Sequence, residues 1–405
     1  MSLREKTKIF YRWDFLFLLY LLLAIAGSLS QYFKGAQYFN DLSYTHYNNF
    51  VIFKQSFIHL LQGKDLYLLY PAEHWDYYKY SPSFALFMAP FAIFPDIIGL
   101  LLWNTLNCLV VFFALKKITT IDARSKTLLL LFISVELFTS VQNAQSNGLL
   151  AGLIVLAYSA LENKRLLPAT LFIVLSFYLK IFGLAAAILF ILYPNRVKFI
   201  LYISGWMIIV GILPLLIISP EKLLDLYQSW IQLLLQDQSI SQGLSVMGIL
   251  RSWFTIQLPQ LSILILAVLL LLLPLIRREL YLSENFRLNY LASLLIWLVI
   301  FNHKAESPTY IIAMSGAGLW FFSQQLSRIN IFLAGLAFIL TSFSSTDLFP
   351  KVVRDSMIIP YQLKALPCIL IWIKIQIDFW FMSEPKHLAV SPEIRKITRE
   401  KSESD

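Results

Sequence analysis

Long apolar segments separated by short polar ones are the feature that most limits what this chain can fold into. A helix needs about 20 apolar residues to cross the hydrocarbon of a bilayer. Five segments are close to that length: Trp13 to Phe33, Asp96 to Leu115, Lys198 to Ile218, Pro259 to Ile276 and Tyr361 to Phe381. Shorter apolar segments are Thr127 to Val141, Gly148 to Leu161, Leu166 to Tyr178, Ile181 to Tyr193, Leu288 to Phe301, Pro308 to Phe322 and Asn330 to Ser342. The pattern predicts an all-α polytopic membrane protein with about twelve transmembrane helices.

The composition excludes an ordinary soluble enzyme. Of the 405 residues, 58% are hydrophobic and 14% are charged, whereas a soluble domain is about 25% charged. The net charge of +9 does not indicate a nucleic-acid partner, because the basic residues form short clusters between apolar segments, as in cytoplasmic loops. Cys108 and Cys368 lie in apolar segments without a CxxC partner, so neither a disulfide framework nor a thiolate metal site is expected.

The basic residues also predict the orientation in the plasma (inner) membrane. With the N-terminus inside, the inner segments carry 21 Lys and Arg residues, the longer outer segments carry 11, and Lys374 lies within the last apolar segment. Because cytoplasmic loops are the basic ones, we expect both termini to be cytoplasmic. The first apolar segment resembles a signal peptide but is longer than a typical one, so we expect a retained helix. Residues 1–383 are predicted to form one transmembrane domain and residues 384–405 a disordered cytoplasmic tail.

Lys180 interrupts the apolar stretch from Leu166 to Tyr193. A single helix there would place its ammonium group at the bilayer centre, which costs about 3 kcal/mol on insertion scales. Two short helices joined at an outer turn avoid this cost and leave Lys164, Arg165 and Arg196 on the inner side. We therefore expect the chain to break at Lys180.

Two long polar loops are predicted on the outer side, at residues 34–95 and 219–258. In each, apolar residues recur at helical spacing, which predicts an amphipathic helix on the outer leaflet or one that only covers the bundle. These residues are Phe50, Phe53, Phe57 and Leu60 in the first loop and Leu223, Tyr227, Trp230 and Leu234 in the second. A third interfacial helix, interrupted by Pro90, is expected between Pro82 and Pro95.

Polar side chains gather on the outer connections, which is where we expect the functional site. Lys180 is placed to meet a lipid phosphate or only to anchor its helix at the interface. Asp65 is at least as well suited to capping a turn as to chemistry, and the amides of residues 142–147 suit either a helix connection or sugar binding. The candidates are Asp41, Asn49, Asp65, Tyr80, Gln145, Asn147, Lys180, Arg251, His303 and Glu306. Glu136, inside an apolar segment, must be neutral, paired or next to a cavity.

Several motifs of nucleotide and metal chemistry are missing from the sequence. It contains no D-x-D pair, no H-E-x-x-H, no G-x-x-x-x-G-K-[ST] and no histidine pair at metal-ligand spacing. We therefore expect no metal and no cofactor. A reaction whose donor already lies in the membrane fits these residues better than one that uses a soluble nucleotide sugar.

Several segments of the first loop form a recognisable set. They are Asn48-Asn49-Phe50, the stretch from Leu61 to Tyr67, Tyr78-Lys79-Tyr80-Ser81-Pro82 and the stretch from Pro90 to Pro95. Together they resemble glycosyltransferase family 87, the polyprenyl-phosphate-mannose-dependent mannosyltransferases. Ala144-Gln145-Ser146-Asn147 is similar to the Gly-Gln-x-Asn turn of that family, and Lys180 to its Lys-x-x-Pro region without the proline. The resemblance runs from about residue 10 to residue 325. It implies a GT-C architecture with an active site at the extracytoplasmic membrane surface.

The catalytic base is where the sequence departs from the family. The resemblance places an aspartate in the first loop as the base, but Asn49 occupies that position here. An amide cannot accept the proton of an acceptor hydroxyl, so the base would be another carboxylate. Asp41 is favoured because it lies on the loop that carries the base in the family, Glu306 is second because the helix that begins at Pro308 places it at the same surface, and Asp65 is third. Glu306 stands in Glu306-Ser307-Pro308-Thr309-Tyr310, where the family has Ser-Pro-x-Ser-Trp.

These observations predict a membrane glycosyltransferase that moves a hexose, by resemblance mannose, from a polyprenyl-phosphate donor to a lipid-linked or cell-surface glycan. Lys180 and Arg251 would neutralise the donor phosphate, whereas Asn49, Asp65, Tyr80, Gln145, Asn147 and His303 would bind the substrates. The alternatives are a transporter or lipid-glycan flippase without transferase activity, and a noncatalytic scaffold. A transporter predicts ionisable residues deep in several helices and repeated halves. Here only Glu136 and Lys374 are deep, and no repeat is evident.

Overall fold

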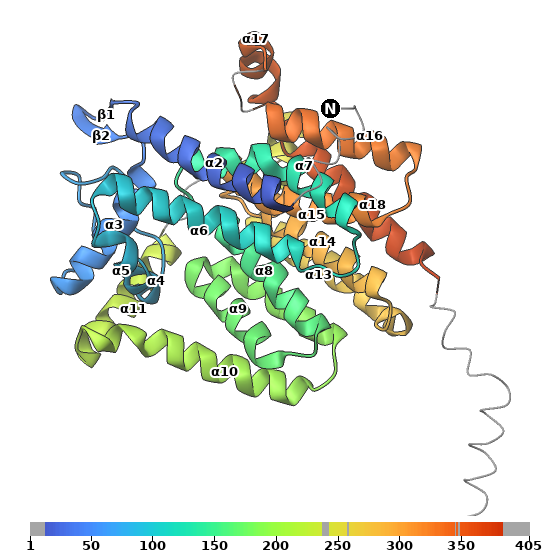
Figure 1. Cartoon of the computed structure of the whole chain (residues 1–405), viewed down its shortest axis with the longest axis horizontal. Coiled ribbons are helices and arrows are strands. Elements are labelled where there is room, and N and C mark those ends of the chain that lie inside the picture. Colours follow the sequence, from blue (N-terminus) through green and yellow to red (C-terminus); the bar gives the residue numbers. More distant parts are fainter. Residues whose placement is uncertain (1–12, 237–242, 257–258, 345, 347–348, 384–405) are drawn as a thin grey trace, which may run out of the picture.

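The computed structural model describes residues 13–236, 243–256, 259–344, 346 and 349–383. Helices occupy almost all of the described regular structure, as expected (Figure 1). In chain order the helices of the first half are α2 Trp13–Tyr32, α3 Asn48–Leu61, α4 Pro82–Phe87, α5 Ala89–Ala92, α6 Asp96–Lys116, α7 Ala123–Gln142, α8 Asn147–Glu162, α9 Leu166–Leu179, the 3₁₀ helix η1 Ile181–Leu192, and α10 Arg196–Ile212, which continues as η2 Leu213–Leu216.

The second half is helical as well. Its helices are α11 Pro220–Gln236, α12 Val246–Phe254, α13 Gln260–Leu272 continued by η3 Leu273–Ile276, η4 Arg278–Leu280, α14 Glu284–Ile300, η5 Ser307–Thr309, α15 Tyr310–Ser323, α16 Arg328–Leu336 continued by the π-helical η6 Ala337–Phe343, α17 Lys351–Val353, the π-helical η7 Arg354–Ile358, and α18 Leu366–Phe381. Each of the twelve apolar segments therefore contains a helix.

Four helices of the described chain are long and apolar enough to cross a membrane: α2, α6, α7 and α10 with η2. The other apolar helices are shorter, so the number of about twelve transmembrane helices remains a prediction. The break at Lys180 is confirmed, because α9 ends at Leu179 and η1 begins at Ile181. The last helix begins at Leu366 rather than near Tyr361, and Pro367 occupies its first turn, where proline is tolerated.

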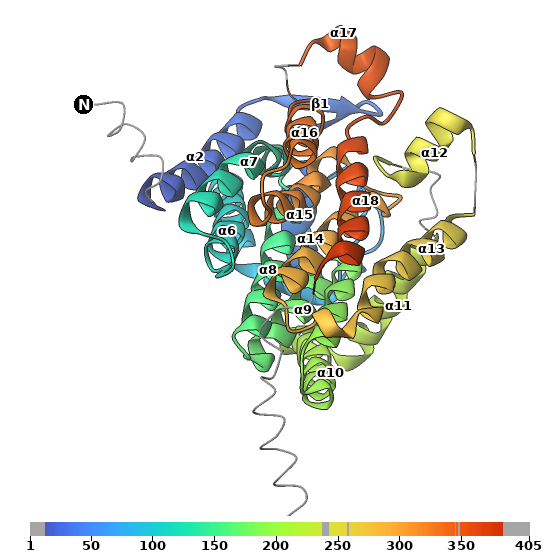
Figure 2. The ribbon, with the colours of Figure 1, turned by 90° about the vertical axis from the view of Figure 1, so that its right-hand side faces the viewer.

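The helices pack side by side around a pair that is buried along almost its whole length, α14 and α15 (Figure 2). The helix α2 packs on α6 and α7, α6 packs on α8, and α8 packs on α9. By contrast, α10 packs mainly on α9. Only 22% of the most apolar stretch of α10 and η2 is buried within the protein. An apolar helix surface that the protein leaves uncovered is suited to contact with lipid.

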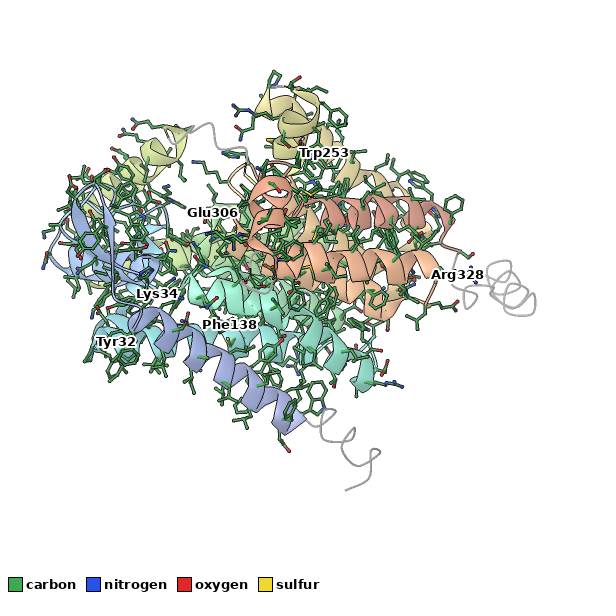
Figure 3. All side chains as sticks on the ribbon, turned by 90° about the horizontal axis from the view of Figure 1, so that it is seen from above. Tyr32, Lys34, Phe138, Trp253, Glu306 and Arg328 are labelled. Atoms are coloured by element: carbon green, nitrogen blue, oxygen red, sulfur yellow. The ribbon has the colours of Figure 1, made fainter. Side chains whose placement is uncertain are left out.

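The segments between α2 and α6 gather at one end of the bundle (Figure 1). Tyr32 and Lys34 lie at this end and Arg328 lies at the other (Figure 3). We call the first the site end and the second the basic end. The predicted loop helices are present as α3, α4, α5 and α11, with the interruption before Pro90.

The predicted all-α fold did not include a small β-hairpin that the structure contains. Strands β1 Ala36–Phe39 and β2 Leu42–Thr45 pair antiparallel. Asn40 and Asp41 have φ values of 48° and 63°, the left-handed conformation that a two-residue type I′ turn requires and that Asn and Asp tolerate best after glycine. The sequence signal is short, and the hydrophobicity of the surrounding chain obscured it.

Candidate functional site

The turn between α7 and α8, residues 143–146, is the base of the candidate site. Ala144 has a φ of 49°, a left-handed conformation that costs a non-glycine residue about 1–2 kcal/mol. Its carbonyl oxygen accepts a hydrogen bond from Trp103 Nε1 at 3.0 Å. The side chain of Asn107 accepts one from the backbone N–H of Leu149 at 2.9 Å. Two buried residues of α6 thus fix this turn and the start of α8.

Lys180 meets this turn. Its Nζ donates a hydrogen bond to Asn147 Oδ1 at 2.7 Å and lies 5.9 Å from the ring centres of Tyr80 and Phe182. Lys180 is the single residue between the end of α9 and the start of η1. Burial lowers its pKa to about 8, and the nearby Glu306 carboxylate acts in the opposite direction. A partly dehydrated ammonium group therefore faces a neutral amide and aromatic rings.

Asn147 connects Lys180 to the loop between α14 and α15. While its Oδ1 accepts from Lys180, its Nδ2 donates to the carbonyl oxygen of Pro308 at 3.0 Å. Glu306 precedes η5 in this loop and is exposed; Figure 3 shows it at the site-end termini of the two helices. Its carboxylate acts electrostatically on both Lys180 and Tyr80. One carboxylate and one ammonium group thus share the same small region.

Tyr80 and Asn49 attach the first loop to the same turn. The hydroxyl of Tyr80 lies 3.3 Å from Ser146 Oγ, and its ring stacks on Phe84 with centroids 4.7 Å apart. Asn49 Nδ2 donates to the carbonyl oxygen of Asn143 at 2.9 Å. Five of the predicted residues therefore come from four separate connections into one cluster, which we call the Lys180 cluster: Asn49, Tyr80, Asn147, Lys180 and Glu306.

Gln145 lies in the same turn, and its side-chain oxygen accepts no hydrogen bond from the described residues. Its Oε1 is buried and has no hydrogen-bond partner within the described part of the chain. A buried polar atom without a partner costs about 1–3 kcal/mol, so Gln145 has a carbonyl group available for a ligand hydroxyl.

The remaining predicted residues have other surroundings. Asp41 lies exposed at the tip of the β-hairpin. Asp65 caps a turn, the alternative to a chemical role that the sequence suggested. Its Oδ1 accepts from the backbone N–H of Tyr67 at 2.9 Å, and its Oδ2 accepts from Ser229 Oγ of α11, also at 2.9 Å. His303 Nδ1 lies 2.6 Å from Gln260 Nε2.

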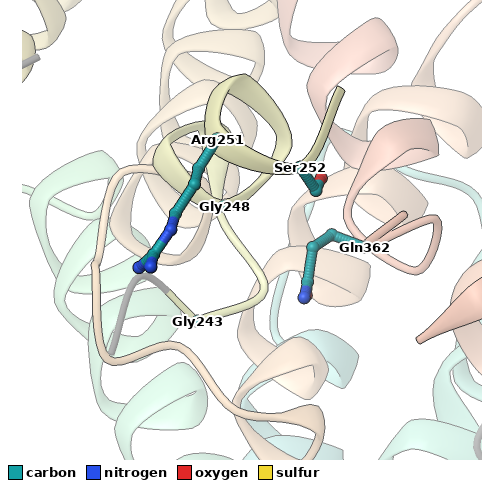
Figure 4. A pocket seen from close by; sticks show the side chains of 5 residues that line it. All are labelled: Gly243, Gly248, Arg251, Ser252 and Gln362. Atoms are coloured by element: carbon teal, nitrogen blue, oxygen red, sulfur yellow. The ribbon is translucent and has the colours of Figure 1, made fainter. Parts of the chain in front are cut away.

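Arg251 lines a separate cavity of about 370 Å³ (Figure 4). The other lining residues are Gly243, Gly248, Ser252 and Gln362. This cavity borders the Glu306 loop, because the backbone N–H of Leu244 donates to the carbonyl oxygen of Ala305 at 2.9 Å.

Glu136 has the partner that its position in α7 requires. Lys364 Nζ lies 2.6 Å from its Oε1, and both side chains are almost completely buried. The ammonium group also lies 5.5 Å from the ring centre of Tyr310. This ion pair joins α7 to the turn before α18.

Three contributors to the Lys180 cluster were not singled out from the sequence: Ser146, the carbonyl oxygen of Pro308 and Trp103. Ser146 belongs to the amide-rich turn that was noticed, but a serine beside a helix start is ordinary. The other two act through contacts that only the tertiary fold creates. Within the described residues, no three His, Cys, Asp or Glu side chains are grouped closely enough to hold a metal ion.

Comparison with known proteins places the chain in a family. A search of curated proteins found no match. A model of glycosyltransferase family 87 matches residues 78–301, which is more than half of the chain. Tyr80, Gln145, Asn147, Lys180 and Arg251 lie within that range, and Glu306 lies just beyond it. The resemblance seen in the sequence is thereby confirmed, and the protein belongs to glycosyltransferase family 87.

Proposed function

We propose that this membrane glycosyltransferase moves a hexose, by family analogy mannose, from a polyprenyl-phosphate donor to a lipid-linked or cell-surface glycan. The observation that carries the proposal is Lys180, a partly buried cation whose hydrogen-bond acceptor is a neutral amide. Burying a charge without an opposite charge is costly, and the phosphate of a lipid donor would supply that opposite charge at the membrane surface.

Lys180 would bind the donor phosphate and stabilise it as the leaving group. As the sugar departs, negative charge builds up on the phosphate oxygens, and a fixed ammonium group in a water-poor site is worth more there than in bulk water. Tyr80 and Phe182, whose rings flank the ammonium group, would exclude water. Gln145, with its unused carbonyl oxygen, would orient a sugar hydroxyl.

Glu306 is the base that we favour over Asp41. The acceptor oxygen attacks the anomeric carbon, the bond from that carbon to the phosphate oxygen breaks, and polyprenyl phosphate leaves with the electron pair. The proton of the acceptor hydroxyl passes to the carboxylate. Glu306 is close enough to act electrostatically on Lys180 and Tyr80, whereas Asp41 occupies the tip of the hairpin. Asn49 would orient the acceptor.

The proposal includes a GT-C-type bundle that works without a metal, with the site end facing away from the cytoplasm. Arg251 borders the Glu306 loop rather than contacting Lys180 directly, so we assign it to the phosphate or glycan of either substrate as it approaches that loop. The excess of Lys and Arg on the opposite connections supports this orientation.

Orientation is tested by cysteine labelling in intact cells. Lys64 is exposed on the first loop and Lys117 on the α6–α7 connection, so an impermeant thiol reagent should label Lys64→Cys and not Lys117→Cys. Lys117 is a better probe than Arg277, whose guanidinium group bonds three carbonyl oxygens near the end of α18. Labelling of the Lys117 variant alone would reverse the orientation and remove the lipid-phosphate argument.

The activity is tested with purified protein in proteoliposomes that contain a radiolabelled polyprenyl-phosphate hexose and membrane glycolipid extract. We expect label to move to the acceptor in an acceptor-dependent way. Transbilayer movement of labelled donor without transfer would indicate a flippase and contradict the proposal. Glu306→Gln, which keeps the donor-binding lysine, serves as the matched control and should transfer little label.

A further inference from the structure

A second cavity, of about 810 Å³, lies away from the Lys180 cluster. It forms where η1 ends and α10 begins, and the turn before α14 closes it. These are the ends of η1 and α14 opposite to Lys180 and Glu306, so the cavity belongs to the basic end. Its lining residues are Ile191, Leu192, Tyr193, Pro194, Asn195, Arg196, Val197, Lys198, Tyr281 and Leu282.

The cavity is mostly apolar and continues onto an apolar helix surface. Val197 and Leu282 are 72% and 67% exposed, so the protein leaves their apolar surfaces uncovered beside the cavity. Further along α10, Ile200 and Leu201 are 52% and 64% exposed. A lipid acyl chain could therefore run from the cavity along α10 without leaving hydrocarbon.

The polar rim of the cavity is cationic. Neither Arg196 nor Lys198 forms an ion pair with a carboxylate in the described chain. Arg196 donates a hydrogen bond to the carbonyl oxygen of Ile191 at 3.1 Å, which holds its guanidinium group near the lining. Arg278 adds to the positive field, since it and Arg196 both act electrostatically on the hydroxyl of Tyr281.

Two of the three carboxylates that the described chain places near this region are already engaged by other cations. Glu279 is paired with Arg277 at 2.7 Å, and Glu162 is paired with Arg287 at 2.6 Å. Glu284, in the first turn of α14, is exposed. Three cations, Arg196, Lys198 and Arg278, therefore face one exposed carboxylate, and a net positive charge remains beside the apolar cavity.

We propose that this cavity binds an anionic phospholipid, with its phosphate between Arg196 and Lys198 and one acyl chain on Val197 and Leu282. The occupant is a bilayer lipid rather than the sugar donor, because the cavity is at the opposite end from the Lys180 cluster. A basic pocket between helices at the headgroup level is a recognised way to select anionic lipids. The bound lipid would fix the junction of η1 and α10. This proposal does not depend on the glycosyl-transfer proposal.

The first test uses the wild-type protein, purified in detergent and supplied with phosphatidylglycerol or phosphatidylethanolamine of identical acyl chains. Native mass spectrometry counts the lipids that each sample retains. We expect one phosphatidylglycerol to be retained preferentially and the preference to shrink at high salt, because exposed charges are screened. Equal retention of the two lipids would overturn the proposal, since the cavity would then accept any acyl chain.

The second test removes the charges and, separately, the apolar space. Arg196→Gln with Lys198→Gln should weaken phosphatidylglycerol binding roughly thirtyfold, the effect of two headgroup cations at about 1 kcal/mol each. The matched control is Lys117→Gln with Arg165→Gln, which removes two exposed cations from other connections of the basic end and should change retention little. Leu282→Trp fills the cavity, keeps every charge and should also displace the lipid. An unchanged preference in both cavity variants, or an equal loss in the control, would refute the assignment.

Discussion

Arg287 and Lys180 are both partly buried cations, but their partners differ. Arg287 donates two hydrogen bonds to the carboxylate of Glu162, at 2.6 and 2.7 Å, and Tyr193 donates a third to the same group at 2.5 Å. Lys180 donates to the neutral amide of Asn147. At the basic end, the charge of Arg287 is therefore neutralised by a carboxylate of the protein. At the site end, the side chain bonded to Lys180 carries no charge, so an anionic ligand could neutralise this cation.

We interpret Arg287 as a structural cation and Lys180 as the proposed binding cation. The Arg287 pair links α8 to α14 and, through Tyr193, to the end of η1. A bidentate pair of this kind has little capacity left for another anion. Lys180, with a lowered pKa and no formal negative charge bonded to it, gains most from a phosphate. The predictions below test this distinction.

The largest effect is expected at the proposed base. Glu306→Gln should lower the transfer rate by roughly two to four orders of magnitude, the usual contribution of general base catalysis. Donor binding should persist, because Lys180 is unchanged. Single-turnover transfer and donor binding are measured on the same preparation. Asp41→Asn is the matched control and should keep its activity; loss of transfer in that variant alone would move the base to the hairpin.

The next effect concerns the Arg287 pair. Glu162→Gln should lower the free energy of unfolding by about 3 kcal/mol, because it leaves the guanidinium group of Arg287 largely buried without a counter-charge. Thermal unfolding in detergent provides the measurement. The intrinsic transfer rate of the folded fraction should stay near that of the wild type. A variant that remains stable but loses transfer would contradict the division between the two ends.

Lys180 is expected to act through affinity. Lys180→Ala should weaken donor binding about tenfold to a hundredfold, the range for a hydrogen bond to a charged group, and Lys180→Arg should retain part of it. The ammonium form is present below the pKa of about 8, so wild-type donor affinity should fall as the pH rises through 8. The arginine variant should not show this fall. Equal binding by all three proteins would leave Lys180 as an interfacial anchor.

The smallest effect is expected at the pair of His59 and Glu73, which lies at the site end but has a carboxylate partner, as Arg287 does. His59 of α3 lies at the site end, yet its Nε2 is 2.9 Å from the Glu73 carboxylate, although the alignment is too poor for a hydrogen bond. If the partner rather than the location decides the role, His59 should affect stability and not transfer.

The pH dependence of this pair has a definite sign. Burial lowers the pKa of His59, with Lys64 and His74 acting in the same direction and Glu73 opposing them. Because the folded state binds the proton less well than the unfolded state, the stability of α3 should be greatest above the unfolded pKa of about 6.5 and decline below it. The opening free energy of residues 48–61, obtained from deuterium exchange after correction for the intrinsic exchange rate at each pH, should therefore fall as the pH falls. His59→Gln should flatten this dependence, whereas a fall that persists in the variant would assign it to other groups.

Much of the helical organisation could be predicted, because long apolar segments and basic connections report directly on helices. The break at Lys180 followed from the cost of burying a charge, and Glu136 was expected to be neutral, paired or next to a cavity. The structure pairs Glu136 with Lys364, which lies 228 residues away along the chain. Local sequence could therefore not predict this partner. The hairpin at residues 36–45 was missed because its four-residue strands carry little pattern.

The candidate site could be predicted as a collection of residues but not as an arrangement. Its members were recognised as polar groups on outer connections, yet nothing in the sequence paired Lys180 with Asn147. The sequence also favoured Asp41 over Glu306 as the base, the reverse of the order that the structure supports. The turn geometry of Asp41 and the position of Glu306 beside Lys180 distinguish them in the structure.

The side chain of Asn147 has a consequence for the order in which substrates bind. One amide group holds Lys180 through its oxygen and the loop of Glu306 through its nitrogen. A donor phosphate that draws Lys180 away also releases the amide that positions this loop, and an acceptor that moves the loop acts on Lys180 in return. Donor and acceptor affinities should therefore be thermodynamically coupled, and each substrate must change the affinity for the other by the same factor.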